Sequence, residues 1–458
     1  MKARLVPLYF SSQEDPDFVS QLRELRRLLA DEAELADPLP LGAALPDADA
    51  VVFPQMVGEA YRRLAEFRQL GVPVLVLTSE FGTMAMWDWE IISYLRGEGI
   101  SLLAPYSLAG AITVCRALAA KRELREGRFL VYQDSPGEGG FQPGIFKRFY
   151  WWEEECAERI HDRFGLRIVK KSFEELGARA KAVPDAQARE DWNGFRATVP
   201  LADVSDRATL SAMKMYRAVR DELDESEGAL AVGINCLNES MFSDTTPCLA
   251  WNLLYEERGL IWGCEGDMVS MLTKFIVHRS LHVPIMMSNL YPFLVGRAAL
   301  DHERIPEFPS VDDDPENYVL AAHCGYLGVV PQSFATEWKL RRKVLAIVDD
   351  NATAIDARLP VGDLTLSKLD PTFERLIIVE GELTGYAGWP GSDCLNGAVI
   401  RVPDGHALME GLPSHHSLLS SGHDLPGFKQ VAQVFGLQVE LLGGRIGTTN
   451  RPGAKASI

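Results

Sequence analysis

Short apolar runs alternate with longer amphipathic stretches over the first third of the chain. The predicted strands are the runs Arg4–Phe10, Ala50–Phe53, Val72–Leu77, Ile100–Ala104 and Arg128–Gln133. Apolar positions spaced three or four residues apart predict helices at 18–30, 56–70 and 107–122. Because strands that alternate with helices form parallel sheets, we expect residues 1–150 to form a doubly wound N-terminal α/β domain.

A second alternating set occupies residues 151–340. Helical patterns near 151–164 and 209–224 come first, and helices near 245–257 and 268–281 then separate further apolar runs. Those runs predict strands at Leu230–Asn235, Leu260–Gly263, Ile285–Met287 and Tyr318–Ala321. The same reasoning predicts a second doubly wound α/β domain.

The pattern changes in residues 341–458. Strand-like runs separated by Gly and Pro occur at Lys343–Val348, Ala352–Arg358, Leu376–Val379 and Ala398–Val402, with a helix near 426–436. This part is expected to be a β-rich C-terminal domain. The predicted fold class is therefore α/β, with two doubly wound parallel-sheet units followed by that domain.

Charge and composition exclude several classes of function. A formal net charge of −18 disfavours nucleic acid or an anionic membrane surface as the main partner. No apolar run reaches membrane-spanning length, and the 7 scattered cysteines form no CxxC pair, which favours a cytoplasmic location. The glycine-rich stretch at 136–140 lacks the full GxGxxG spacing, so dinucleotide binding is not expected.

Candidate chemistry begins at Glu265, in the stretch Cys264–Asp267 that follows the apolar strand. Carboxylates at the C-terminal end of such a strand lie where α/β sheets bind ligands, and they can hold a metal or carry a proton. The alternative is that Asp267 caps the next helix and Glu265 is merely solvated. The following predicted strand leads into Asn289, and two parallel strands would place Glu265 and Asn289 at the same sheet edge.

Three histidines lie close together at His415, His416 and His423, in a chain with 9. Carboxylate oxygen with imidazole nitrogen suits Mn²⁺, Fe²⁺, Co²⁺ or Zn²⁺, so Glu265, Asn289 and His416 are a candidate metal site. The alternative is that the histidines are exposed in a loop.

Two further residues are candidates for contact with a substrate. His323 ends a predicted strand and could be a metal ligand, a hydrogen-bond donor to substrate or a core histidine. Trp389 lies in a loop context where its ring could stack on the C–H surface of a ligand, although most tryptophans are core residues.

Several motifs together resemble the L-fucose and L-arabinose isomerase superfamily. They are Cys264–Asp267 before an amphipathic helix, His323–Gly325, the run Gly362–Thr365 leading to Val379–Glu382, and His416 with Gly422–His423. The resemblance is clearest over residues 228–440, and residues 1–225 match only in general α/β character. It implies a fucose isomerase-like fold.

In that family a Glu, an Asp and a distant His bind a divalent metal, usually Mn²⁺. By motif, the Glu falls on Glu265, the His on His416 and the Asp on Asn289, while His423 keeps a spacing like the family's and is expected to contact substrate. Glu265 and Asn289 are thus the implied catalytic residues. An amide can offer an oxygen to a cation, but it carries no charge and accepts no proton.

The implied activity is metal-dependent aldose–ketose isomerisation of a pentose, a 6-deoxyhexose or a related sugar through an enediolate, with Glu265 moving the proton. The resemblance also implies a homo-oligomer, a hexamer by analogy. Asn289 leaves alternatives open: a variant isomerase with another acid, a lyase or epimerase with altered chemistry, or a non-catalytic sugar-binding relative.

Overall fold

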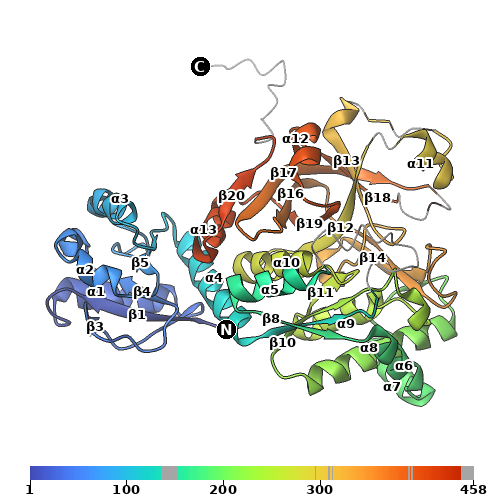
Figure 1. Cartoon of the computed structure of the whole chain (residues 1–458), viewed down its shortest axis with the longest axis horizontal. Coiled ribbons are helices and arrows are strands. Elements are labelled where there is room, and N and C mark those ends of the chain that lie inside the picture. Colours follow the sequence, from blue (N-terminus) through green and yellow to red (C-terminus); the bar gives the residue numbers. More distant parts are fainter. Residues whose placement is uncertain are drawn as a thin grey trace. The chain divides into compact units, whose positions relative to one another are not determined.

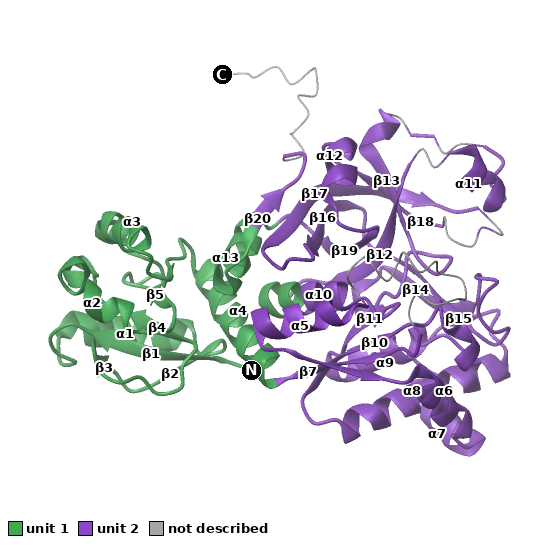
Figure 2. Cartoon of the chain, viewed as in Figure 1, with its two compact units in different colours: residues 1–126, 276–282, 424–438 green, residues 127–275, 283–423, 439–458 purple. Residues whose placement is uncertain are grey.

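The computed structural model describes residues 1–135, 152–293, 296–307, 310–311, 313–389, 392 and 396–444 (Figure 1). The chain divides into two compact units, coloured separately in Figure 2. Unit 1 comprises residues 1–126, 276–282 and 424–438, and unit 2 comprises residues 127–275, 283–423 and 439–458. The glycine-rich stretch 136–140 lies outside the described residues.

Unit 1 contains the parallel sheet expected at the N-terminus. Its strands run in the order β2-β1-β4-β5-β6, with β3 also paired to β1, and each pairing is parallel. They are β1 (Ala3–Tyr9), β2 (Ala33–Leu35), β3 (Leu39–Pro40), β4 (Ala50–Phe53), β5 (Val74–Val76) and β6 (Leu102–Leu103). The helices are α1 (Pro16–Leu28), α2 (Leu64–Arg68), α3 (Trp89–Gly97), α4 (Leu108–Glu126) and α13 (Leu425–Phe435).

A second parallel sheet lies in unit 2, in the order β11-β10-β7-β8. Its strands are β7 (Arg128–Tyr132), β8 (Arg167–Lys171), β10 (Ala229–Ile234) and β11 (Ile261–Cys264). The run at 128–133 was expected in the N-terminal sheet, and that expectation is wrong. A short apolar run fits any buried parallel strand, so its sequence does not identify its neighbours.

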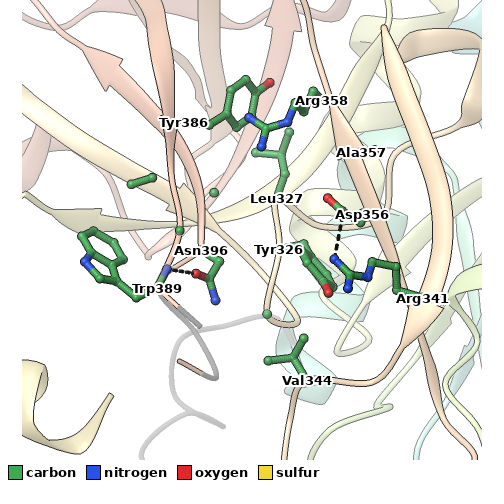
Figure 3. A pocket seen from close by; sticks show the side chains of 14 residues that line it. Tyr326, Leu327, Arg341, Val344, Asp356, Ala357, Arg358, Tyr386, Trp389 and Asn396 are labelled. Carbon is green, nitrogen blue, oxygen red and sulfur yellow. Dashed lines mark hydrogen bonds and ion pairs between the residues drawn. The ribbon is translucent and has the colours of Figure 1, made fainter. Parts of the chain in front are cut away.

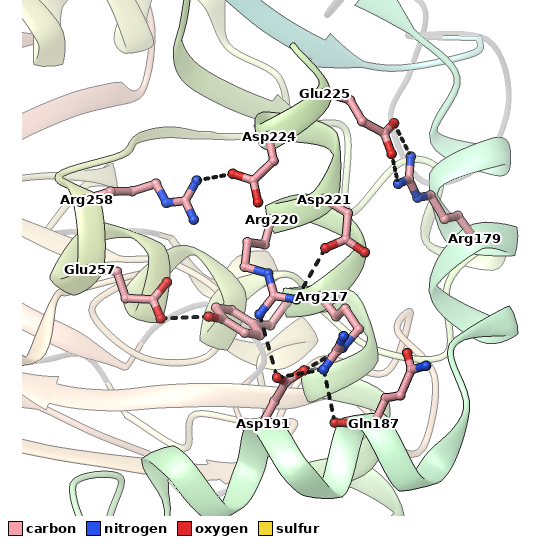
Figure 4. Close-up of polar contacts among 11 residues, drawn as sticks. Arg179, Gln187, Asp191, Arg217, Arg220, Asp221, Asp224, Glu225, Glu257 and Arg258 are labelled. Atoms are coloured by element: carbon pink, nitrogen blue, oxygen red, sulfur yellow. Dashed lines mark hydrogen bonds and ion pairs between the residues drawn. The ribbon is translucent and has the colours of Figure 1, made fainter. Parts of the chain in front are cut away.

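Helices α5 (Glu154–Phe164), α6 (Phe173–Ala182), α7 (Asp185–Phe195), α8 (Asp206–Glu225) and α9 (Cys248–Arg258) accompany this sheet (Figure 1). Polar contacts join several of these helices, some at exposed and some at largely buried positions (Figure 4). They include Arg217 with Asp191, Tyr216 with Glu257, Arg258 with Asp224 and Arg179 with Glu225. Exposed ion pairs contribute little individually, so most of the helix packing energy comes from buried apolar residues.

Two adjacent glycines allow helix α10 (Met268–Leu281) to approach the parallel sheet closely. Gly233 and Gly263 are register partners on β10 and β11. A β-carbon at Gly263 would lie 2.2 Å from Met271 Cγ, and one at Gly233 would lie 2.6 Å from Met271 Sδ. The two glycines therefore leave room on the sheet surface for the Met271 side chain, close to the turn that contains Glu265.

The remaining large sheet of unit 2 closes into an antiparallel barrel. Its order is β16-β19-β12-β13-β18-β17-β20, and an additional pairing of β16 with β17 closes the ring. The strands are β12 (Ile285–Pro292), β13 (Tyr318–Ala322), β16 (Gly362–Leu369), β17 (Arg375–Ala387), β18 (Gly397–Arg401), β19 (His416–Ser421) and β20 (Gln438–Leu441). Closure removes the exposed sheet edges of the six ring strands.

This arrangement corrects the expected second doubly wound domain. The strands that contain Ile285–Met287 and Tyr318–Ala321 belong to the barrel and are antiparallel to their neighbours. Strand, helix, strand patterning is compatible with a parallel crossover, but here α10 leads from one sheet into another. Nothing in the local pattern distinguishes the two outcomes.

A small sheet completes unit 2, with β14 (Glu337–Arg342) between β15 (Thr353–Arg358) and β9 (Leu201–Ala202). The expected strand at 343–348 is wrong, because β14 ends at Arg342 and the following residues form a loop. Two shorter helices are α11 (Arg297–His302) and α12 (Gly405–Gly411). No helix within the described ranges is long and apolar enough to cross a membrane.

Gly263→Ala should destabilise the protein, because the added β-carbon overlaps Met271. Overpacking of this kind costs about 1–3 kcal/mol in the free energy of unfolding. Urea unfolding measures this cost in a double-mutant cycle made of Gly263→Ala, Met271→Ala and the double variant. In the Met271→Ala background, Gly263→Ala should cost less than half of what it costs in the wild type. An equal cost in both backgrounds would show that Met271 is not the steric partner.

Candidate functional site

Glu265 follows β11 in a left-handed turn. Its φ is +55° and that of Gly266 is +67°, and the Asp267 amide donates to the Cys264 carbonyl at 3.2 Å. The Trp152 indole donates to the Glu265 carbonyl at 2.7 Å. A non-glycine residue in this region costs about 1–3 kcal/mol and persists only where its surroundings enforce it. The backbone of Glu265 is thus held in one conformation.

Asp267 is fully buried and accepts hydrogen bonds from several directions. The Ser270 amide and hydroxyl each donate at 2.8 Å, so Asp267 caps helix α10 as one alternative expected. The Lys368 ammonium donates at 2.9 Å, and His416 Nδ1 lies 2.8 Å away. Burial alone would raise the pKa of Asp267, but Lys368 and His416 outweigh burial and lower it.

His416 begins strand β19 and is fully buried, so it is not the exposed loop histidine of the alternative interpretation. Its Nε2 lies 3.7 Å from Glu265 Oε1. Glu265 and His416 therefore converge, as the sequence predicted, although 150 residues separate them. Burial lowers the pKa of His416, but its contacts with Asp267 and Glu265 outweigh burial and raise it to about 9.

The pKa of Glu265 shifts in the opposite direction to that of His416. Its side chain is buried, with 3% of the residue surface exposed. Burial raises the pKa of Glu265, but the nearby His416 imidazolium outweighs burial and brings the pKa to about 2. Contacts within the protein therefore keep Glu265 ionised and the neighbouring His416 protonated.

Asn289 reaches the same site by a route that differs from the expected one. It lies opposite His416 in the antiparallel pairing of β12 with β19, so the two side chains project from the same face. Asn289 Oδ1 is buried and makes no hydrogen bond within the described residues, while Nδ2 lies 3.3 Å from the Tyr291 hydroxyl. The amide oxygen is available as a ligand.

His323 begins a tight turn. His323 and Tyr326 pair across it, with positive φ at Cys324 and Gly325, the pattern of a type I′ turn. The His323 ring lies 6.2 Å from that of His416, and the His415 ring lies 4.4 Å from it. Burial, with the charge of His416, lowers the pKa of His323 to about 4 and that of His415 to about 3, so both are neutral.

The two other expected substrate contacts, Trp389 and His423, have different partners among the described residues. Trp389 packs beside Phe293 and Tyr318 and lines a separate cavity (Figure 3). His423 Nε2 bonds the Gly381 carbonyl at 2.8 Å, and its Nδ1 lies 3.9 Å from Asp363. Within the described residues, neither Trp389 nor His423 has a hydrogen bond, ion pair or ring contact with Glu265 or His416.

A divalent cation fits the donor types at this site. Within the described ranges, no group of three or more His, Cys, Asp or Glu side chains is arranged to hold a metal ion. Two of the three expected ligands are of those types, and the third is the Asn289 amide. Donors about 2.1 Å from one cation lie up to about 4.2 Å apart, which accommodates the 3.7 Å between His416 and Glu265. Asp267 orients His416 as carboxylates commonly orient metal-bound histidines.

Comparisons with known proteins give no assignment. No protein-family model matches the chain, and no curated protein matches it significantly. The resemblance to sugar isomerases therefore rests on the motifs alone.

Sequence reasoning missed two buried lysines beside the site. Lys368 is two residues after Leu366 and four after Leu364, so it shares their face of β16, and a lysine in that alternating apolar pattern was a visible signal for a paired charge. Lys274 lies inside α10 with its ammonium 2.9 Å from the Trp262 carbonyl and 3.6 Å from the centroid of the Trp262 ring. Burial lowers the pKa of Lys274 to about 7.

Lys274→Met should stabilise the protein at neutral pH. A lysine in the unfolded chain has a pKa near 10.4. Between about pH 7 and 10 the unfolded chain therefore binds more protons than the folded protein, and the free energy of unfolding of the wild type increases with pH. The advantage of Lys274→Met should therefore shrink by about 1.4 kcal/mol per pH unit across this range. Urea unfolding of both proteins at several pH values measures it, and a constant difference would contradict the lowered pKa.

Proposed function

We propose that this protein is a metal-dependent aldose–ketose isomerase acting on a pentose, a 6-deoxyhexose or a related sugar. The observation that carries the proposal is the buried Glu265 carboxylate 3.7 Å from His416 Nε2, with Asp267 on the other ring nitrogen. Glu265, His416 and Asn289 would hold the cation. When bound, a divalent cation supplies positive charge that stabilises the oxygens of a sugar as its C2 proton leaves.

Glu265 is the residue that would move the proton. It is ionised, buried and held by a fixed backbone, as a general base requires. A pKa of about 2 makes it a weak base, and its interaction with protonated His416 is a main cause. Loss of the proton from His416 would therefore make Glu265 more basic.

Asp267 is poorly suited to be a second base. Its oxygens accept from Lys368, Ser270 and His416, so no lone pair is directed at a substrate. Asn289 accepts no proton either. One base can remove the proton from C2 and return it to C1, and part of the original hydrogen would be carried across. The reaction is balanced when a second proton passes from the C2 hydroxyl to the C1 oxygen.

The non-catalytic alternative is favoured by one observation, the neutral amide at 289. An amide binds a divalent cation more weakly than a carboxylate does. A sugar-binding relative, or a lyase or epimerase using the same base, would keep Glu265 and His416 together and differ in the product formed.

Glu265→Gln should abolish isomerisation, with an expected loss of at least about 10²-fold, because the amide removes no proton. The assay is proton NMR in D₂O with Mn²⁺ and a panel of pentoses and 6-deoxyhexoses, following exchange at C2 and product formation. Glu382→Gln is a matched control, because Glu382 pairs with Arg401 at the surface. Undiminished turnover in Glu265→Gln would show that Glu265 takes no part in the mechanism. Hydrogen exchange at C2 without ketose formation in the wild-type protein would favour an epimerase.

Asn289→Asp should tighten Mn²⁺ binding by about tenfold or more, because an added anion meets the cation at short range in a buried site. Isothermal titration calorimetry of both forms measures the affinity. Asn193→Asp adds the same charge at an exposed position in α7 and should leave it unchanged. Equal affinity in wild type and Asn289→Asp would show that residue 289 is not a ligand.

A further inference from the structure

Unit 2 contains a cavity of about 460 Å³ that the proposed isomerase site does not use. Its wall combines aromatic, cationic and amide side chains from three parts of the fold, as Figure 3 shows. The main residues are Tyr326, Arg341, Arg358, Tyr386, Trp389 and Asn396. Cavities of this size hold small molecules in many proteins.

Hydrogen bonds hold the Tyr386 side chain and the Trp389 backbone in the cavity wall. The Tyr386 hydroxyl accepts from the Leu359 amide at 2.7 Å and donates to the Leu359 carbonyl at 3.0 Å. The Trp389 amide donates to Asn396 Oδ1, which fixes the start of the loop. Aromatic faces held in this way offer flat surfaces for the C–H groups of a sugar.

The two arginines are only loosely neutralised. Arg358 lies over the Tyr386 ring at 4.6 Å, and its Nε is 3.6 Å from the exposed Glu337 carboxylate. Arg341 makes two ion pairs of 3.4 Å, with Asp356 and with the exposed Asp203. Long, exposed ion pairs are weak, so an incoming anion competes with them easily.

Arginines outnumber carboxylates among the residues that line this cavity. Arg341 and Arg358 line it with Asp356. Glu337 and Asp203 reach the arginines from outside the lining and can be displaced by an anion inside it. Guanidinium groups bind phosphate, sulfonate and carboxylate oxygens with paired hydrogen bonds. The cavity therefore selects an anion with an attached apolar or C–H face.

We propose that this cavity binds a small anionic carbohydrate. Arg341 and Arg358 bind its phosphate, sulfonate or carboxylate group, and Tyr386 and Trp389 contact the sugar. The site does not require Glu265 or a metal ion. It adjoins the turn that positions His323, because Tyr326 belongs to both.

The test is calorimetric titration of the full chain in EDTA with fructose 6-phosphate, glucuronate and fructose. Both anionic sugars should bind at least tenfold more tightly than fructose. Arg358→Met, which keeps the apolar stem, should weaken their binding at least tenfold. Arg342→Met removes the same charge from the neighbouring strand β14 outside the cavity and should change affinity less than twofold.

Trp389→Ala should weaken binding of both anionic sugars, and thermal unfolding of each variant confirms that it is folded. Three results would overturn the proposal: no binding of either anionic probe, equal losses in Arg358→Met and Arg342→Met, or loss of binding in Glu265→Gln. The last would place the ligand at the Glu265 site instead. Inactive Glu265→Gln that retains binding supports both proposals separately.

Discussion

The buried carboxylate of Asp267 is the interaction on which the architecture of unit 2 depends. It joins the start of α10 through Ser270, strand β16 through Lys368 and strand β19 through His416. Burying an ionised carboxylate costs several kcal/mol unless its oxygens are paired. The contacts with Lys368 and His416 also connect the parallel-sheet segment to the barrel, so the charge requires both parts to be in place at once.

The sequence predicted individual elements better than their partners. The runs at 50–53, 230–235 and 260–263 became parallel strands in the expected places, because a buried strand leaves a clear apolar signature. The run at 285–287 carries the same signature, yet its strand β12 lies in an antiparallel barrel. Its pairing depends on β19, over a hundred residues away, and no local pattern encodes a contact of that range.

The candidate site, like the fold, was predicted from the sequence only in part. Glu265 and His416 could be brought together by motif, and they do converge. The role of Asp267 toward His416 was hidden, because the residue also satisfies the simpler role of helix cap. The substrate contacts expected of Trp389 and His423 stay predictions, because loop context and spacing do not measure distance in a folded chain and the contacts of both residues lie with other partners.

Charge balance gives Asn289 a physical meaning. With Glu265 and Asp267 ionised and Lys368 charged, one negative charge remains, and a proton on His416 neutralises it. A carboxylate at position 289 would leave one negative charge uncompensated in this buried site, at a cost of several kcal/mol. The amide therefore lets the buried groups of this site remain balanced in charge with a single proton on His416, and no further partner is needed to neutralise position 289.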